Sequence, residues 1–227
     1  NKAKVLFNDL ISLQNPISSD LNTMRPSTIP NLLEAINQNK SRMYTRAKIF
    51  EVGPNFSKSP NDYQENVASA ITYGSIDEEN WLSSKNYSNV FTVKADLFVV
   101  LSCLNVPTEN LIYDKNECNI YHPGKSSILR LGKNIIAKFG ELHPILLKTM
   151  NINIKVYGFE IFLDNISQFQ LNKSSSRGAF FNNPYQMVER DFAFLLPKEI
   201  KANEIIKKVK KIDKNIINKV TIFDVYE

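Results

Sequence analysis

Cysteine and histidine are scarce in this chain of 227 residues, which contains two of each. Cys103 and Cys118 are too few for a disulfide scaffold, and the shortage of both residue types argues against a structural zinc site. No apolar run approaches the roughly 18 residues of a membrane-spanning helix, and the first residues lack the pattern of a signal peptide. These absences predict a soluble intracellular protein rather than a secreted or membrane-spanning one.

The motifs of several enzyme classes are absent as well. Neither a P-loop, nor a G-x-G-x-x-G dinucleotide fingerprint, nor a G-x-S-x-G nucleophile elbow occurs in the sequence. Gly124-Lys125-Ser126 is only a weak candidate for binding phosphate through backbone N–H groups. His122 and His143 each precede a proline, and no cysteine or second carboxylate accompanies either one. This pattern favours histidines that cap turns over histidines that act as general bases or metal ligands.

Positive charge is concentrated near the C-terminus. The chain carries 28 basic and 23 acidic residues, a net charge of +5. Eight lysines and three acidic residues lie between Lys198 and Lys219, so this window alone accounts for +5 and the rest of the chain is balanced. Such a window suggests a polyanionic partner, and the alternative is a solvated lysine face on an amphipathic helix.

Hydrophobic periodicity in the first third of the chain predicts two strands after a helix. Residues 3–13 are typical of a strand that enters a turn. Beyond Arg25-Pro26 a helix is expected, with Ser27 as its N-cap and Pro30 in its first turn. Its apolar stripe is formed by Ile29, Leu32, Leu33 and Ile36. Two strands, 46–53 and 67–74, then flank a polar loop.

Farther along, a second helix is expected near 93–104, because Leu97, Val100, Leu101 and Leu104 recur at helical spacing. Cys103 lies within this helix and is expected to behave as a small buried hydrophobe. Trp81 is expected in the core or at an interface rather than as a stacking platform.

The second half begins with a strand pattern. Gly132-Lys133-Asn134 predicts a hairpin between strands 127–131 and 135–141, and residues 155–163 alternate as a further strand. Residues 172–178 are polar and without periodicity, which is typical of a linker.

The tail is expected to be β-α-β. Strands are expected at 190–196 and 219–225, with a helix near 202–212 between them, and the aromatic side chains of these strands are expected to pack under the helix. Together the patterns indicate an α+β fold with a mostly antiparallel sheet, not a doubly wound one.

Six motifs in order carry a resemblance to a known family. They are Asn15-Pro16-Ile17-Ser18 with Met24-Arg25-Pro26-Ser27 and Ile29-Pro30, Ile49-Phe50-Glu51-Val52-Gly53, Tyr121-His122-Pro123-Gly124-Lys125-Ser126, Phe139-Gly140-Glu141-Leu142-His143-Pro144, Arg190-Asp191-Phe192-Ala193-Phe194 and Phe223-Asp224-Val225-Tyr226. In this order and spacing they resemble the C-terminal part of the bacterial phenylalanyl-tRNA synthetase beta subunits, over nearly the whole chain.

The resemblance implies a fold like the catalytic core of class II synthetases, without catalytic residues or a metal. The helix after Arg25 would correspond to the class II motif 1 helix, which builds subunit interfaces, so the interface residues would be Arg25, Ile29, Leu32, Leu33 and Ile36. An active motif 2 has an ATP-binding arginine two residues before its glutamate. Ile49 takes that position before Glu51, and residues 161–166 lack the motif 3 arginine.

The tail resembles the start of the family's ferredoxin-fold anticodon-binding domain, of which only the first β-α-β is expected here. The expected domains are therefore residues 1–175, the class II-like core, and 176–227, the half domain. Where the family usually has Phe-Pro followed by two basic residues, this chain has Gln186 in place of the proline and Glu189 in place of one basic residue. The expected tRNA-binding residues are Arg190, Lys207, Lys208, Lys210, Lys211 and Lys214.

The function implied by the resemblance is that of a non-catalytic part of a phenylalanine–tRNA ligase. It would support a heterotetramer and dock tRNA while the whole cytoplasmic enzyme uses ATP and magnesium to charge tRNA with phenylalanine. Its partners would be the alpha subunit, a second alpha–beta pair and the phenylalanine tRNA, with no membrane. Two alternatives are a stand-alone RNA- or protein-binding module that shares the synthetase fold, and a freestanding enzyme that uses His122 or His143.

Overall fold

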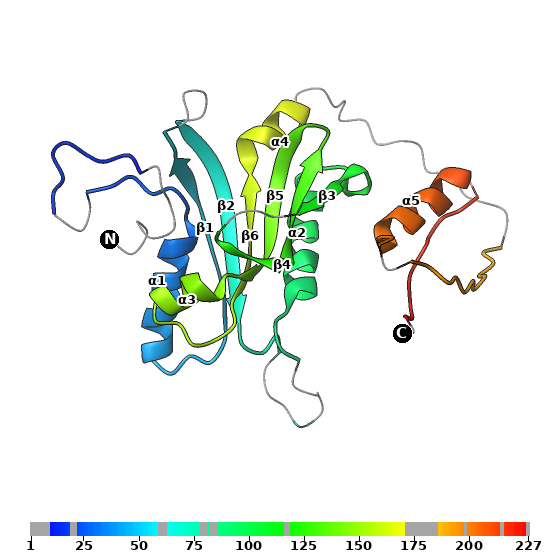
Figure 1. Cartoon of the computed structure of the whole chain (residues 1–227), viewed down its shortest axis with the longest axis horizontal. Helices are drawn as coiled ribbons and strands as arrows, with labels where there is room; N and C mark the ends of the chain where they lie inside the picture. Colours follow the sequence, from blue (N-terminus) through cyan, green and yellow to red (C-terminus); the bar gives the residue numbers. More distant parts are fainter. Residues whose placement is uncertain are drawn as a thin grey trace. The chain divides into compact units, whose positions relative to one another are not determined.

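The computed structural model describes residues 10–18, 22–58, 63–77, 81, 86–115, 119–170, 186–197, 199–213 and 216–225. The chain divides into two compact units, Asn1–Ser175 and Ser176–Glu227 (Figure 1). Among the described residues, the first unit contains the sheet and most of the helices, and the second contains one helix, α5 (Ala202–Ile212). No helix within these described ranges is long and apolar enough to span a membrane.

The first unit is built on a six-stranded sheet in the order β1-β2-β6-β5-β4-β3, with every pairing antiparallel. Its strands are β1 (Ala47–Phe56), β2 (Gln64–Tyr73), β3 (Ile112–Lys115), β4 (Tyr121–Leu131), β5 (Asn134–Leu142) and β6 (Tyr157–Phe162). The expected α+β class with an antiparallel sheet is confirmed. The predicted pairs of strands around residues 46–74 and around Gly132 are both present, and Gly132 turns the second pair with a φ of +63°.

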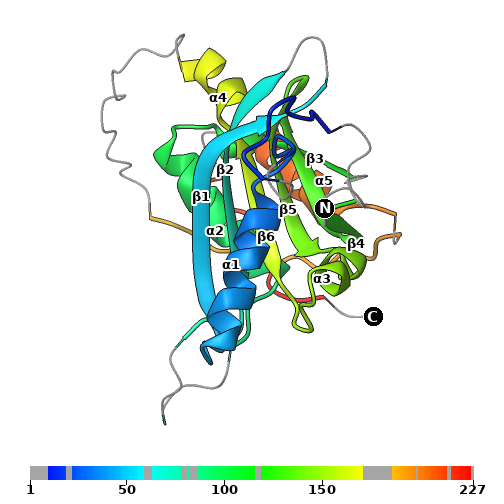
Figure 2. The ribbon, with the colours of Figure 1, turned by 90° about the vertical axis from the view of Figure 1, so that its left-hand side faces the viewer.

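Helices cover both faces of this sheet (Figures 1 and 2). Helices α1 (Ile29–Ser41) and α3 (Pro144–Thr149) enclose one apolar core, to which β2 contributes Ile71. Helix α2 (Val90–Cys103) and the start of α4 (Leu163–Gln170) enclose the other. A short 3-10 turn, η3 (Thr108–Asn110), follows α2. The central strand β6 has all six residues buried, because it is covered on both faces.

Helix α1 begins where the sequence predicts, with a different N-cap. Pro30 lies in its first turn, and the four apolar side chains of the predicted stripe are between 0% and 5% exposed. The N-cap is Thr28 instead of Ser27, and the Thr28 side chain makes no capping hydrogen bond. The Ser27 hydroxyl accepts a hydrogen bond from the Ile29 N–H at 3.1 Å, so it still satisfies one backbone donor of the first turn.

Two expectations about buried side chains, those for Cys103 and Val100, are wrong, and one of the two alternatives for Trp81 is excluded. Cys103 is exposed, because it follows the buried Leu101 by two positions, which is about 200° around the helix. Val100, expected on the buried stripe, is 36% exposed, and the inward side of α2 is formed by Val93, Leu97 and Leu101. Trp81 is 94% exposed and therefore not part of the core.

The second unit contains the predicted helix but not the predicted strands. Residues 186–197 and 216–225 adopt no strand, so the expectations for 190–196 and 219–225 are wrong in this structure. A strand forms only when its backbone groups pair with a neighbour, and no pairing occurs among the described residues of this unit.

Other expectations fall wholly or largely outside the described residues. The linker 172–178 and Cys118 lie outside them, as do the first seven residues of the strand expected at 3–13. Of the remainder of that strand, Ser12 forms an isolated antiparallel bridge with Thr23.

Candidate functional site

Arg25 connects the loop before α1 to the edge strand β1. Its Nε donates a hydrogen bond to the carbonyl of Pro54 at 2.7 Å, and its guanidinium forms an ion pair with the carboxylate of Glu51. A side chain at Gly53 would collide with this arrangement, because a Cβ there would lie 2.3 Å from Arg25 Nη2. The position of Arg25 between a turn and a proline-initiated helix predicts that it fixes this loop against the core or a partner instead of binding a ligand, and these contacts fit the first alternative.

A buried carboxylate holds the same part of α1 to the centre of the sheet. Glu160 of β6 accepts hydrogen bonds from the Ser27 hydroxyl at 2.8 Å and from the Tyr121 phenol at 3.2 Å. It pairs in register with Ser69 on β2 and with Lys138 on β5, and the hydroxyl of Thr28 donates to the Ser69 hydroxyl. These bonds fix the N-terminal end of α1 on the sheet.

Burial raises the pKa of the Glu160 carboxyl, while the Ser27 hydrogen bond, the charge of Lys138 and the Tyr121 hydrogen bond act in the opposite direction. Glu160 was not predicted from the sequence as a site residue. The available signal was a single acidic residue inside the otherwise apolar segment that forms β6. An acid in a buried strand requires hydrogen-bond partners.

We expect Glu160→Gln to change the pH dependence of stability. Because the folded-state pKa of Glu160 lies above the ordinary glutamate value of 4.5, this group contributes most stability below pH 4.5, and stability falls as pH rises through the folded-state pKa. Glutamine cannot ionise. At pH 5 the free energy of unfolding of the variant should therefore lie within about 1 kcal/mol of that of the parent, and at pH 8 the variant should be more stable relative to the parent than at pH 5.

Urea unfolding at both pH values measures this effect, with exposed Glu34→Gln as the control. A difference between parent and Glu160→Gln that is the same at pH 5 and pH 8 would contradict the assignment of Glu160 as a group with a raised pKa.

The residues at the expected nucleotide position are apolar or already paired. Ile49, in place of the phosphate-binding arginine, packs against the core beneath α1. The nearby cation Arg25 is engaged by Glu51 and by Pro54. Within the described ranges, no three His, Cys, Asp or Glu side chains lie close enough together to hold a metal ion. At this position the described residues therefore present an apolar side chain and an ion pair in place of a phosphate-binding arginine.

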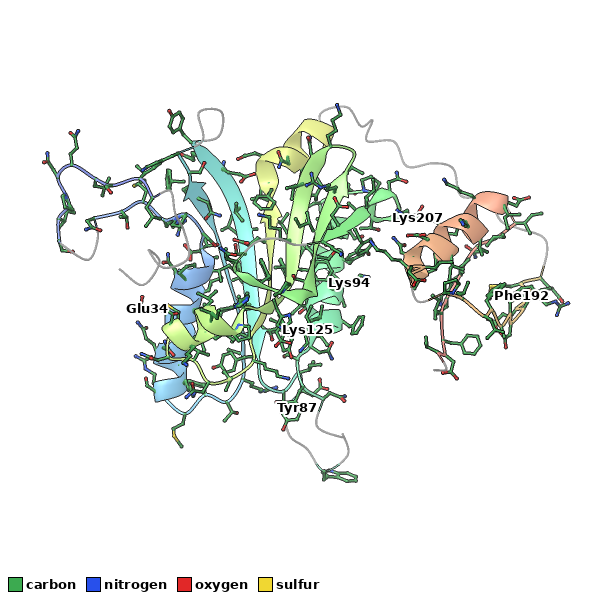
Figure 3. The ribbon with its side chains drawn as sticks, in the orientation of Figure 1. Glu34, Tyr87, Lys94, Lys125, Phe192 and Lys207 are labelled. Atoms are coloured by element: carbon green, nitrogen blue, oxygen red, sulfur yellow. The ribbon has the colours of Figure 1, made fainter. Side chains whose placement is uncertain are left out.

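The two histidines cap turns, as the sequence predicts. Nδ1 of His122 accepts from the Gly124 N–H at 3.0 Å, and Nδ1 of His143 accepts from the Ile145 N–H at 3.2 Å. The two rings stack with their centroids 6.4 Å apart. The ammonium of Lys125, which Figure 3 labels, forms an ion pair with the buried Glu141 at 3.1 Å.

The four apolar side chains expected at a subunit interface lie in the chain's own core. Ile29, Leu32, Leu33 and Ile36 pack with the residues of α3 and β2. They cannot contact another subunit directly while α1 is in place, which corrects that part of the expectation. The exposed side of α1 carries Asn31 and Glu34, and Figure 3 shows Glu34 on the side away from the sheet.

In the second unit, the expected cationic surface lies on α5. Lys207 and Lys211 lie opposite the apolar stripe of Ile205, Ile206 and Val209, and Lys208 and Lys210 flank them. Figure 3 labels Lys207 on this helix. Arg190 is exposed in the segment before α5, and Lys214 lies outside the described residues.

The described aromatic side chains of this unit are exposed, so the expectation that they pack under the helix is wrong. Phe192 and Phe194 are 73% and 61% exposed, and their rings stack with centroids 6.3 Å apart. Phe223 is also 73% exposed, and Tyr226 lies outside the described residues.

Comparisons with known proteins assign a family to each unit. Residues 4–163 match the model of the phenylalanyl tRNA synthetase beta chain CLM domain, and residues 183–227 match the ferredoxin-fold anticodon binding domain. Curated relatives include the phenylalanine–tRNA ligase beta subunits of Rhodospirillum rubrum, 36% identical over 219 residues, and Zymomonas mobilis, 35% identical over 216 residues. The matches cover 96% and 94% of this chain but only 27% of each relative.

Solved structures support the fold. A pyrrolysyl tRNA synthetase from Desulfitobacterium hafniense superposes with a TM-score of 0.56 and 15% sequence identity, over 75% of this chain and 56% of that protein. At this level of identity the likeness concerns the fold alone, and it confirms the expected class II synthetase-like arrangement of the sheet.

Proposed function

Because the chain belongs to the phenylalanyl-tRNA synthetase beta chain family, we propose that it is a non-catalytic region of a phenylalanine–tRNA ligase beta subunit. Its role is to support assembly with the alpha subunit and to dock the phenylalanine tRNA, while ATP-dependent charging takes place elsewhere in a cytoplasmic enzyme of two alpha–beta pairs. The observation that carries the proposal is the sheet at Glu51. There the ion pair between Arg25 and Glu51 and the apolar side chain of Ile49 take the place of a nucleotide site.

The two units have different roles in this proposal. We assign residues 1–175 to the class II-like core and residues 176–227 to the start of the anticodon-binding domain. The two compact units and the two family matches support this assignment. The core contributes the sheet, on which Arg25 and Glu160 bind groups of the same chain, and the second unit contributes the lysines of α5 for contacts with tRNA phosphates.

Assembly through α1 would use the exposed side of that helix. The Arg25 contacts and the Glu160 network fix the start of α1, so Asn31 and Glu34 are held in place on its outer side. In this proposal Arg25 and the apolar stripe act as positioning residues, because they set the position of the surface that meets the alpha subunit.

We expect the isolated chain to show no activation of phenylalanine. Without the arginines that stabilise the charge on the reacting phosphates, pyrophosphate exchange with ATP and phenylalanine should remain at background. The same assay with the alpha subunit and the full-length beta subunit is the positive control. Exchange by the purified chain, freed of host synthetase, would contradict the proposal.

The assembly part of the proposal has a separate test. Co-expression with the alpha subunit of the same organism should give a complex that contains both proteins in size-exclusion chromatography. If neither this chain nor the full-length beta subunit co-purifies with the alpha subunit, the assembly role is wrong even where pyrophosphate exchange is absent.

A further inference from the structure

Within the described residues, the outer edge of β1 is contacted only near its C-terminal end, at Pro54 and Phe56. Among these residues, strand β1 is the first in the sheet and pairs only with β2. On its other side, the Phe56 N–H donates to the carbonyl of Arg25 at 2.9 Å, and the Pro54 carbonyl accepts from Arg25 Nε. Alternate residues of a strand direct their backbone groups to the same side. Lys48, Phe50 and Val52 therefore direct their N–H and carbonyl groups to this outer edge.

Below Pro54 this edge has no partner in the part of the chain that the structure describes. Among those residues, no backbone hydrogen bond reaches β1 from outside the sheet between Lys48 and Val52. The register with β2 runs without a shift from Ala47 to Phe56, so the strand is regular over its whole length. Figure 2 looks onto this edge of the sheet. A regular strand with unpaired backbone groups is a template for a further strand.

The side chains along this segment are apolar and exposed. Phe50 is 77% exposed and Val52 is 59% exposed, on the face of the sheet opposite α1. Proteins commonly protect an edge strand with lysine or proline. Here the ammonium of Lys48 is bound to Asp96 of α2 at 2.9 Å, and Pro54 lies beyond the exposed segment. The edge between them carries two large hydrophobic side chains, and the charge of Lys48 beside them is paired with Asp96.

We propose that an extended segment of the longer beta-subunit polypeptide pairs with β1 over Lys48–Val52 and forms a seventh strand of the sheet. The segment carries uncharged, apolar side chains at alternate positions, which cover Phe50 and Val52. It continues the edge contact that Arg25 already makes with Pro54 and Phe56. The inference rests on the proposed function, because the occupant belongs to the part of the relatives' length that this chain does not span.

Hydrogen exchange at single residues tests this pairing. In the full-length beta subunit, the amides of Phe50 and Val52 should exchange at least about 100-fold more slowly than in the 227-residue chain. The amides of Ile49 and Glu51 face β2 and serve as controls that are protected in both proteins. Unchanged exchange at Phe50 and Val52 would overturn the proposal. Protection that appears only after the alpha subunit is added would also overturn it, because the strand would then come from another chain.

A proline substitution removes the proposed hydrogen bond without disturbing the pairing with β2. Val52→Pro eliminates an outward-facing N–H, and Pro54 shows that β1 accepts proline at an equivalent position two residues away. The isolated variant should keep the melting temperature of the parent within a few degrees, while the full-length variant loses protection at Phe50. Val52→Thr, which keeps the N–H, is the matched control and should retain protection.

These results separate the two proposals. Protection of Phe50 in a full-length beta subunit that fails to bind the alpha subunit or tRNA would support the added strand and contradict the proposed function. A full-length beta subunit that binds the alpha subunit and tRNA, but whose Phe50 and Val52 amides are unprotected, would support the proposed function and contradict the added strand.

Discussion

Leu33→Asp should remove most of the stability of the first unit. Leu33 is fully buried beneath α1, between the helix and the sheet. Truncating a buried leucine costs about 2–5 kcal/mol, and burying an unpaired carboxylate adds several more. Because a domain of this kind is stable by only about 5–15 kcal/mol, we expect the variant to be largely unfolded at 37 °C or to unfold at much lower urea concentration. Circular dichroism during urea and thermal unfolding measures the effect.

Asn31→Asp is the matched control for this substitution. It places a carboxylate on the exposed side of the same helix, in its first turn, where a negative charge is favourable. We expect its stability to stay within about 0.5 kcal/mol of the parent. If Leu33→Asp unfolds at the same urea concentration as Asn31→Asp, α1 does not pack on the sheet through its apolar stripe, and the counterpart of motif 1 has been misassigned.

Reversing four charges on α5 should weaken tRNA binding by the whole enzyme at least about 100-fold at low salt. The substitutions are Lys207→Glu, Lys208→Glu, Lys210→Glu and Lys211→Glu. Phosphate contacts release counterions, so the slope of log affinity against log salt should decrease in magnitude by about 3. Because such contacts do not read sequence, cognate and non-cognate tRNA should be affected alike. Filter-binding titrations at two salt concentrations provide both quantities.

The control for this prediction changes the same number of charges on the first unit. It substitutes glutamate for four exposed lysines, Lys40, Lys58, Lys133 and Lys148. This variant should retain most of the affinity, since its net charge matches that of the α5 variant but α5 is intact. Equal losses in the two variants would mean that net charge, and not the α5 surface, governs binding. Tight and discriminating binding by the 227-residue chain alone would show that base recognition lies within it.

Local sequence patterns were sufficient for helices α1, α2 and α5 and for two pairs of consecutive strands, but not for α3, α4 and β3. The stripe from Ile29 to Ile36 and the stripe on α5 each repeat within one segment, so their periodicity reports helix and inward face together. Gly132 supplies a positive φ between two strand patterns, which is enough to predict the hairpin of β4 and β5. The capping roles of His122 and His143 could also be predicted from the sequence, because each imidazole accepts a hydrogen bond from a backbone N–H only two residues away.

The candidate site was only partly predictable. The missing arginine at Ile49 and the anchoring role of Arg25 could be inferred from the motifs. Glu160 was not identified, because its hydrogen-bond donors lie 133 and 39 residues away, at Ser27 and Tyr121. No local pattern shows which distant hydroxyls converge on a buried carboxylate. The same holds for the Gly53 position, whose lack of a side chain makes room for Arg25.

The sequence by itself determined which segments can form helices, which strands follow one another through tight turns, and the absence of the arginines that nucleotide chemistry needs. Tertiary structure decided the exposure of single side chains and the position of β6 between β2 and β5. Cys103 and Trp81 are exposed although their residue types are usually buried, and the alternating segments at 190–196 and 219–225 are not strands. The physical reason is that periodicity describes one segment's own geometry, whereas burial and strand formation require a second surface or strand supplied from elsewhere in the fold.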